Sequence, residues 1–233
     1  MISLVIPAYN EAGRLPKSLE RMRTYLDGAG EGYEVIVVDD GSSDNTAGIV
    51  EEGAREWPEL RAIRLEHNQG KGAAIRTGML AATGAHRLFS DADLSTPIEE
   101  LPKLRARLSG ACQVVIASRA LPETDIQVHQ DRRREIMGRT YNALLRMLVL
   151  PGIRDSQCGF KLFTATAAET CFRPLRTYRF GFDAEALVRA RRAGYGIVEV
   201  PVTWRHVEAS RVNSVRDSSR MLFDLVLLRI RGV

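Results

Sequence analysis

Two aspartates, Asp91 and Asp93, follow the apolar residues Leu88 and Phe89, with one residue between the two acids. If Leu88 and Phe89 begin a buried strand, both carboxylates leave the end of that strand in nearly the same direction. Like charges this close raise each other's pKa unless a positive charge lies between them. The pattern therefore predicts that a positive charge, of a kind still to be identified, belongs at this site.

Polar residues follow three further apolar stretches in the same way. The stretches are 2–6, followed by Pro7-Ala8-Tyr9-Asn10-Glu11; 33–38, followed by Asp39-Asp40-Gly41-Ser42; and 114–117, followed by Ser118-Arg119. Asp and Ser end strands and cap helices in any fold, which explains each group singly. The coincidence of four such groups is better explained by a ligand site past the carboxyl ends of parallel strands.

Helical patterns alternate with these apolar stretches. Leu15, Leu19, Met22 and Leu26 have the spacing of a helix, which Asn10 could cap, and residues 71–82 predict another. Further strands are expected at residues 62–65, 198–202 and 203–204. This alternation predicts an α/β fold with a mostly parallel, doubly wound sheet flanked by helices.

Residues 131–150 begin with Arg132, Arg133 and Arg134 and end in an apolar run. A helix that is basic at one end and apolar at the other is typical of a membrane surface, with arginines available for phosphate groups. A buried helix with a solvated arginine end fits the pattern equally well. Residues 215–230 predict a further helix that carries both leucines and arginines.

The composition excludes several classes of protein. No apolar run approaches 18 residues, so a membrane-spanning helix is not expected, and no signal peptide opens the chain. The net charge of +4 does not by itself indicate a nucleic-acid partner. Cys112, Cys158 and Cys171 are odd in number and form no CxxC pair, which favours free thiols in a reducing compartment.

Six stretches together carry a resemblance to a known family. They are SLVIPAYNEAGRLPKSL (3–19), YEVIVVDDGSSDNT (33–46), HNQGKGAAIRTGM (67–79), SDADLSTP (90–97), ASRA (117–120) and GIRDSQCGFKLF (152–163). In this order they resemble family 2 inverting glycosyltransferases of the GT-A fold, and among these the polyprenyl- or dolichyl-phosphate β-glucosyltransferases and their bacterial relatives. The resemblance implies a single Rossmann-like domain over 1–233, with a nucleotide-sugar-binding half at 1–120 and an acceptor-side half with amphipathic helices at 121–233.

The resemblance also implies what the missing positive charge is. It would be Mg²⁺ or Mn²⁺, ligated by Asp93 and Asp91, together with the diphosphate of a nucleotide sugar. The implied donor-binding residues are Pro7, Ala8, Tyr9, Glu11, Asp39, Asp40, Lys71 and Asp91. Asp40, in preference to Asp39, would accept a hydrogen bond from the base, as suits the N3–H of uracil.

On the acceptor side, a lipid phosphate is already a nucleophile, so the reaction needs arginines to position it more than it needs a base. The candidates are Arg119, Arg132, Arg133, Arg134 and Arg211, together with Gln157. Asp155 would be a base for a hydroxyl acceptor, and would orient arginines or sugar hydroxyls for a phosphate acceptor. Asp91, Asp93 and Asp155 are thus the candidate catalytic residues, and a nucleophilic thiol at Cys158 is not expected.

The favoured function is metal-dependent transfer of glucose from UDP-glucose to a polyprenyl phosphate, by a peripheral protein on the cytoplasmic, inner face of a membrane. GDP-mannose as the donor and a soluble hydroxyl as the acceptor remain open alternatives. A non-catalytic nucleotide-sugar-binding module is a third alternative, against which Asp91, Asp93 and Lys71 weigh. No nucleic-acid partner is expected.

Overall fold

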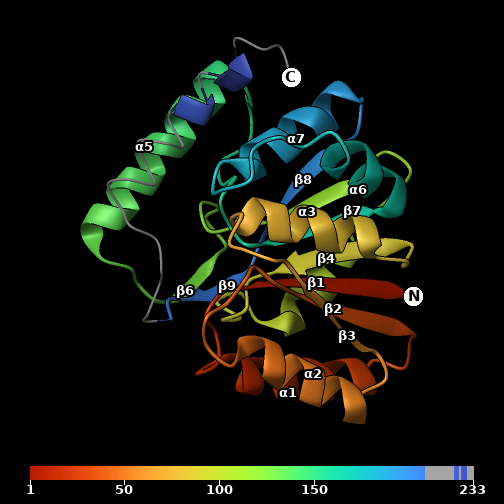
Figure 1. The fold of residues 1–233 in the computed structure, drawn as a ribbon. Coiled ribbons are helices and arrows are strands. Elements are labelled where there is room, and N and C mark those ends of the chain that lie inside the picture. Colours follow the sequence, from red (N-terminus) through yellow and green to blue (C-terminus); the bar gives the residue numbers. More distant parts are fainter. Residues whose placement is uncertain (208–222, 226, 230–233) are drawn as a thin grey trace.

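The computed structural model describes residues 1–207, 223–225 and 227–229 (Figure 1). A seven-stranded sheet with the order β3-β2-β1-β4-β7-β5-β8 forms its centre. The strands are β1 (Ile2–Ala8), β2 (Tyr33–Asp39), β3 (Leu60–Arg64), β4 (His86–Ser90), β5 (Val114–Ser118), β7 (Phe160–Thr164) and β8 (Ile197–Pro201). Only the two pairings of β7 are antiparallel. The predicted mostly parallel α/β fold is confirmed.

Helices cover both faces of this sheet (Figure 1). They are α1 (Leu15–Gly28), α2 (Thr46–Glu56), α3 (Lys71–Ala81), α4 (Leu101–Arg105), α6 (Ala165–Phe172) and α7 (Phe182–Arg192), whereas α5 (Arg132–Leu148) lies beyond one end of the sheet (Figure 1). Alternate side chains of β1 enter the two cores. Ile2, Leu4 and Ile6 pack with α1, α2 and α4, whereas Val5 faces the core formed with α3, α6 and α7.

The start of α1 differs from the expectation that Asn10 caps it. The N-cap is Arg14, because Pro16 lies in the first turn, where its missing N–H costs nothing. Asn10 has a positive φ of 54°, and its side-chain oxygen accepts hydrogen bonds from the backbone N–H groups of Ser43 (2.8 Å) and Asp44 (3.3 Å). Asn10 thus ties the end of β1 to the loop after β2.

Strand β7 was not expected from the sequence. Its FKLFT segment runs directly into α6 without a turn-forming residue, so no signal separates strand from helix. It lies antiparallel between β4 and β5, which would otherwise be neighbours. Strands β7 and β8 both come from the second half of the chain, so the expected halves 1–120 and 121–233 share one sheet.

The helix α5 stands apart from the sheet, on the side toward which the carboxyl ends of the parallel strands point (Figure 1). A small parallel pair, β6 (Asp125–Val128) and β9 (Thr203–Arg205), lies near its start. Within the described residues, none of the helices combines the length and the apolar composition needed to cross a bilayer. Most of the helix expected at 215–230 falls outside the described part; residues 223–225 and 227–229 are helical.

Substitution of two helix glycines by alanine tests the packing of this fold, because the expected changes in the free energy of unfolding have opposite signs. A Cβ on Gly78 of α3 would lie 2.3 Å from Val5 Cγ1 in β1, whereas a Cβ on Gly138 of α5 meets nothing within 4 Å. We expect Gly78→Ala to lower the free energy of unfolding by about 1–3 kcal/mol through overpacking. Gly138→Ala should raise it by about 0.5–1 kcal/mol. Urea unfolding measures both, and stabilisation by both substitutions would contradict the close packing of α3 on β1.

Candidate active site

The carboxyl ends of β1, β2 and β4 meet at one edge of the sheet. The strands are parallel neighbours, with Ala8 opposite Asp39 and Val5 opposite Phe89. From β1 the sheet is extended by β2 on one side and by β4 on the other, so the order reverses here, where ligands bind in open α/β sheets. The acidic residues that follow these strands are therefore brought together, as the sequence predicted.

Lys71 supplies one positive charge to this edge. It is the first residue of α3, and its Nζ lies 2.5 Å from Asp91 Oδ1. Burial acts to lower the pKa of Lys71, but the charges of Asp91 and Asp183 reverse this and raise it. Lys71 therefore stays protonated and positively charged beside Asp91.

Asp93 lacks a comparably close cation. It accepts a hydrogen bond from the backbone N–H of Ser95 (2.9 Å), and Arg14 NH1 lies 3.6 Å from its Oδ2. Burial, and then the charge of Asp91, raise the pKa of Asp93. The carboxylate pair is thus still short of positive charge, as expected for a site that receives a cation.

The donor atoms at this edge fit Mg²⁺ or Mn²⁺, which are hard cations that prefer oxygen ligands. Among the described residues, no group of three or more His, Cys, Asp or Glu side chains could hold a metal ion. Asp91 and Asp93 could therefore provide only part of a coordination shell. Phosphate oxygens and water would have to complete it.

Arg14 is a site residue that the sequence analysis missed. Its Nε and NH2 both donate to the carboxylate of Glu11, and NH1 is buried with no hydrogen-bond partner in the described part of the chain. The side chain thus links the predicted donor-binding residue Glu11 to Asp93. The sequence feature that could have indicated this contact is the spacing of three residues between Glu11 and Arg14, just before α1.

Asp39 and Asp40 have different contacts. Asp40 accepts hydrogen bonds from the backbone N–H groups of Gln69 and Gly70, both at 2.8 Å, and so holds the loop before α3. Asp39 accepts from the N–H of Ser42 (3.1 Å), and its buried Oδ2 has no hydrogen-bond partner among the described residues. An Arg64 Nε lies 3.4 Å from that oxygen. These contacts favour Asp39, and not the expected Asp40, as an acceptor for a ligand.

The residues after β1 line the same edge. Pro7 is half-buried, Ala8 is buried, and Tyr9 exposes 38% of its surface, so an aromatic ring is accessible directly after the end of β1. Glu11 itself is buried, and its backbone N–H donates to Thr46 Oγ1 at 2.8 Å. These positions fit the predicted nucleoside pocket.

Gly159, directly before β7, leaves room for Asp91. The backbone N–H of Asp91 donates to the carbonyl of Gly159 at 3.0 Å. A Cβ on Gly159 would lie 2.1 Å from Asp91 Oδ2, so only glycine allows the carboxylate this position. No pattern in the sequence connects these two residues, which are far apart in the chain.

Arg119 and Asp155 form the second charged cluster, after β5. The Nε, NH2 and backbone N of Arg119 donate to the Asp155 carboxylate at 2.7, 2.9 and 2.9 Å, and the N–H of Gln157 donates at 3.0 Å. Burial acts to raise the pKa of Asp155, but Arg119 outweighs it and lowers this pKa to about 2. A carboxylate so firmly ionised is a poor proton acceptor near neutral pH.

The Arg119 guanidinium also lies over an aromatic ring. Its central carbon is 5.5 Å from the ring centre of Trp204 in β9. Asp155 and Trp204 therefore hold the cation from two sides, while a quarter of the side chain stays exposed.

The remaining predicted acceptor residues come from other elements. Arg132 is exposed in the first turn of α5, and the side chains of Arg133 and Arg134 lie outside the described part, as does all of Arg211. Asn142 of α5 was missed. Its Oδ1 accepts from the backbone N–H and the hydroxyl of Ser156 (3.1 and 3.0 Å), which ties α5 to the loop that carries Asp155 and Gln157.

Cys158 is fully buried, and burial raises the pKa of its thiol to about 11. A thiol that is neutral and inaccessible is a poor nucleophile. This agrees with the expectation that Cys158 shapes the site without attacking a substrate.

Comparison with known proteins identifies relatives over nearly the whole chain. The family model "Glycosyl transferase family 2" matches residues 3–172. Dolichyl-phosphate β-glucosyltransferases are similar: one from Trichomonas vaginalis is 36% identical over 98% of this chain and 73% of its own length, and that of Homo sapiens is 34% identical over 99% and 75%.

A solved structure shares the fold. Glucosyl-3-phosphoglycerate synthase from Mycobacterium tuberculosis, in complex with Mn²⁺, UDP and phosphoglyceric acid, superposes with a TM-score of 0.72 over 98% of this chain and 78% of that one. At 21% identity this likeness concerns the fold alone, which is the predicted GT-A fold.

The Arg119–Asp155 pair predicts a specific response to acid. The folded-state pKa of Asp155 lies below the ordinary value near 4, so the pair stabilises the fold above that value and loses this effect as the pH falls toward 2. We expect the free energy of unfolding of the wild type to fall by on the order of 2 kcal/mol more than that of Asp155→Asn between pH 5 and pH 2.

Urea unfolding across this pH range measures the difference. Asp125→Asn, at an exposed position in β6, is the control and should follow the wild type. Parallel curves for the wild type and Asp155→Asn would contradict the ion pair.

Proposed function

Because the chain belongs to glycosyl transferase family 2, we propose that it transfers glucose from UDP-glucose to a polyprenyl phosphate of the dolichyl type. One observation carries most of this proposal: dolichyl-phosphate β-glucosyltransferases are 32–36% identical to it over 98–99% of its length. The site supports the proposal, because it has charged groups suited to two phosphate-bearing substrates.

The donor nucleotide is proposed to bind at the ends of β1 and β2. In this arrangement the ring of Tyr9 lies beside the base. Asp39 Oδ2, which has Arg64 Nε at 3.4 Å but no hydrogen-bond partner among the described residues, accepts the N3–H of uracil. Asp40 holds the 69–70 loop, so its part in donor binding is indirect. Lys71 faces the diphosphate from the start of α3, where the helix dipole also favours negative charge.

A divalent metal would be held by Asp93 and Asp91. When bound it would neutralise negative charge that develops on the departing nucleoside diphosphate. The raised pKa of Asp93 fits this role, because a cation relieves the repulsion between the two carboxylates.

The acceptor is proposed to approach from the side of Arg119. An oxygen of the lipid phosphate attacks the anomeric carbon of glucose, the bond from that carbon to UDP breaks, and UDP leaves with the bonding electrons. The attacking oxygen carries no proton that must be removed, and attack opposite the leaving group inverts the configuration. Arg119 holds the phosphate against repulsion from the donor, and Asp155 keeps Arg119 in place.

A soluble hydroxyl acceptor fits this arrangement less well. A hydroxyl must lose its proton. Asp155 is the residue that was predicted from the sequence to accept this proton as a general base. Its carboxylate already accepts four hydrogen bonds and has a pKa of about 2. We therefore assign Asp155 to orientation of Arg119.

A donor and acceptor panel tests the proposal. UDP-glucose, UDP-galactose and GDP-mannose are each combined with a short polyprenyl phosphate or with 3-phosphoglycerate, and products are identified by mass. We expect a hexosyl polyprenyl phosphate from UDP-glucose. Product only from GDP-mannose would assign the chain to mannosyl transfer, and product only with 3-phosphoglycerate would replace the lipid acceptor.

The exposed face of α5 is proposed to meet the membrane that holds this acceptor. Ile136 and Met147 are 63% and 73% exposed and lie eleven residues, or about three turns, apart, so they share a face. Arg132 precedes Ile136 by one turn on the same face. The opposite face is packed, with Tyr141 and Leu145 in the core. The proposal thus combines the two alternatives that the sequence left open, a helix at a membrane surface and a helix packed in the core.

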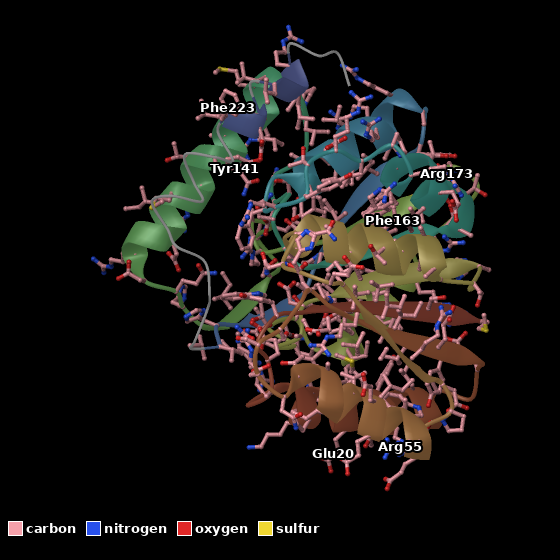
Figure 2. All side chains as sticks on the ribbon, in the orientation of Figure 1. Glu20, Arg55, Tyr141, Phe163, Arg173 and Phe223 are labelled. Carbon is pink, nitrogen blue, oxygen red and sulfur yellow. The ribbon has the colours of Figure 1, made fainter. Side chains whose placement is uncertain are left out.

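Phe223 adds to the apolar surface beside α5. It is 64% exposed, and Figure 2 shows it near Tyr141.

The three cysteines are all buried free thiols, as is usual in a reducing compartment. We therefore propose peripheral binding to the cytoplasmic face of the membrane.

Metal dependence gives a direct prediction. We expect EDTA to abolish transfer and Mg²⁺ or Mn²⁺ to restore it. Asp93→Ala should reduce kcat at least about a hundredfold, since charge on the leaving group is no longer balanced. Its melting temperature should not fall, because the substitution removes a carboxylate that burial and Asp91 disfavour. Glu99→Gln, at an exposed position nearby, is the control, and an active Asp93→Ala would contradict the metal assignment.

Membrane binding gives another prediction. Replacing Arg132, Arg133 and Arg134 by Gln should weaken sedimentation with anionic vesicles, since each surface arginine contributes on the order of 1 kcal/mol. Wild-type binding should itself weaken as salt rises. The KM for the lipid acceptor should rise far more than the KM for UDP-glucose.

Arg55→Gln in α2 is a matched control on a remote exposed helix. Ile136→Asp with Met147→Asp tests the apolar part of the same face. Equal changes in both KM values would mean that the arginines support the fold in general, and unchanged values would mean that they are a solvated helix end.

A further inference from the structure

Lys161 is buried in the middle of β7, with only 1% of its surface exposed. Its Nζ lies 2.5 Å from Asp183 Oδ1 in the first turn of α7, and donates to the carbonyl of Cys158 at 2.6 Å. It also lies 5.1 Å from the centre of the Phe89 ring. Asp183 is 4% exposed, so the core contains a complete ion pair.

Stability alone does not account for this pair. Lys161 lies over Phe89, which in turn contacts Phe163 and Phe182, with ring centres 6.3 and 5.7 Å away, and Figure 2 shows Phe163 inside the domain. Burying two charges in such surroundings has a large desolvation cost. An apolar pair of similar volume is often equally or more stable. The location of the pair indicates another role.

Lys161 contacts the backbone segment that holds Asp91. Lys161 binds the carbonyl of Cys158, and the next residue is Gly159. Gly159 accepts the backbone N–H of Asp91 and leaves the space that the Asp91 carboxylate occupies. A shift of this backbone would therefore move a proposed metal ligand.

The aspartate end acts on the start of α3, where Lys71 lies. The starts of α3 and α7 are in close contact: a Cβ on Gly72 would lie 2.6 Å from Phe182 Cβ, and the N–H of Ala73 donates to the carbonyl of Tyr178 at 3.1 Å. Asp183 follows Phe182 directly, so the ion pair lies where α7 meets the start of α3. Asp183 thus helps to hold the start of α3, and Lys71 with it, in place.

We propose that Lys161 and Asp183 are a positioning pair that holds Asp91 and Lys71, which lie against each other at the proposed diphosphate site, in the arrangement that metal and diphosphate require. Charges of alternating sign run from Lys161 through Asp183 and Lys71 to Asp91. Neither member of the pair touches a substrate. This inference rests on the proposed function, since it names further residues for the same site.

The test separates positioning from stability. In the double variant Lys161→Met/Asp183→Asn both charges are removed at nearly constant volume, so unfolding by urea should show no loss of stability. Its affinity for UDP in the presence of Mn²⁺, measured by calorimetry without sugar or lipid, should fall about tenfold. The KM for UDP-glucose should rise and the KM for polyprenyl phosphate should not.

A remote ion pair gives the matched control. Arg87 of β4 binds Glu169 of α6 at 2.8 Å, at the amino end of the strand that carries Asp91 at its other end. Arg87→Met/Glu169→Gln removes a charge pair from the same sheet and should leave affinity for UDP with Mn²⁺ unchanged. An equal loss in both double variants would mean that the effect is a general one on the fold.

Asp183→Asn alone is a second variant, which is less stable because Lys161 loses its partner and is therefore measured at a temperature at which it remains folded. It removes the charge near Lys71 while Lys161 keeps the carbonyl of Cys158, and it should also weaken binding. Wild-type affinity in either variant would overturn the positioning role and leave the proposed function intact. A wild-type protein that does not bind UDP with Mn²⁺ would contradict the proposed function itself, and this inference with it.

Discussion

The balance of charge around Asp91 and Asp93 is the constraint on which the rest of the site depends. Two carboxylates at the end of one strand repel each other, and each is partly removed from water. Lys71 lies against one of them, and Arg14, already committed to Glu11, lies at a greater distance from the other. The fold thus supplies less positive charge than the pair requires, and the proposed metal would supply the remainder.

Several elements of the fold serve this arrangement. The insertion of β7 between β4 and β5 brings Gly159 to Asp91, and the start of α3 brings Lys71 to the same carboxylate. A parallel sheet with its switch point at β1 and β4 explains why these residues meet at one edge. The positions of the charged residues at this edge therefore depend on buried contacts that other elements of the fold make.

On the acceptor side the sequence left the role of Asp155 open, and its contacts favour the orienting role that we propose. Arg119 fixes the carboxylate so firmly that it serves orientation better than proton transfer. Asn142 joins this loop to α5, whose outer face exposes Ile136 and Met147. The helix proposed to meet the membrane is thus tied directly to the loop proposed to position the acceptor.

Local patterns in the sequence predicted much of the fold. The apolar runs of β1, β2, β4 and β5 and the periodicity of α1, α3 and α5 gave the correct elements and fold class. The family resemblance agrees with the family model. Strand β7 was missed, because FKLFT continues into α6 without a break and contains a buried lysine whose partner lies on another element.

The partners of site residues could not be predicted in the same way. The preference for Asp40 over Asp39 followed from the motif alone, whereas the contacts of Asp40 depend on the loop at 69–70, about thirty residues later. Arg14 had only its spacing from Glu11 as a signal, and its approach to Asp93 depends on how α1 packs against the segment that follows β4. Such contacts are products of tertiary structure, which spacing along the chain does not specify.

Asp91 and Asp93 are proposed to form half of a metal site that the diphosphate completes. Titration of Mn²⁺ into the protein, with and without UDP, tests this proposal. We expect weak binding of Mn²⁺ alone, binding at least about tenfold tighter with UDP present, and loss of this coupling in Asp93→Ala. Mn²⁺ affinity that is the same with and without UDP, or coupling that survives in Asp93→Ala, would contradict it.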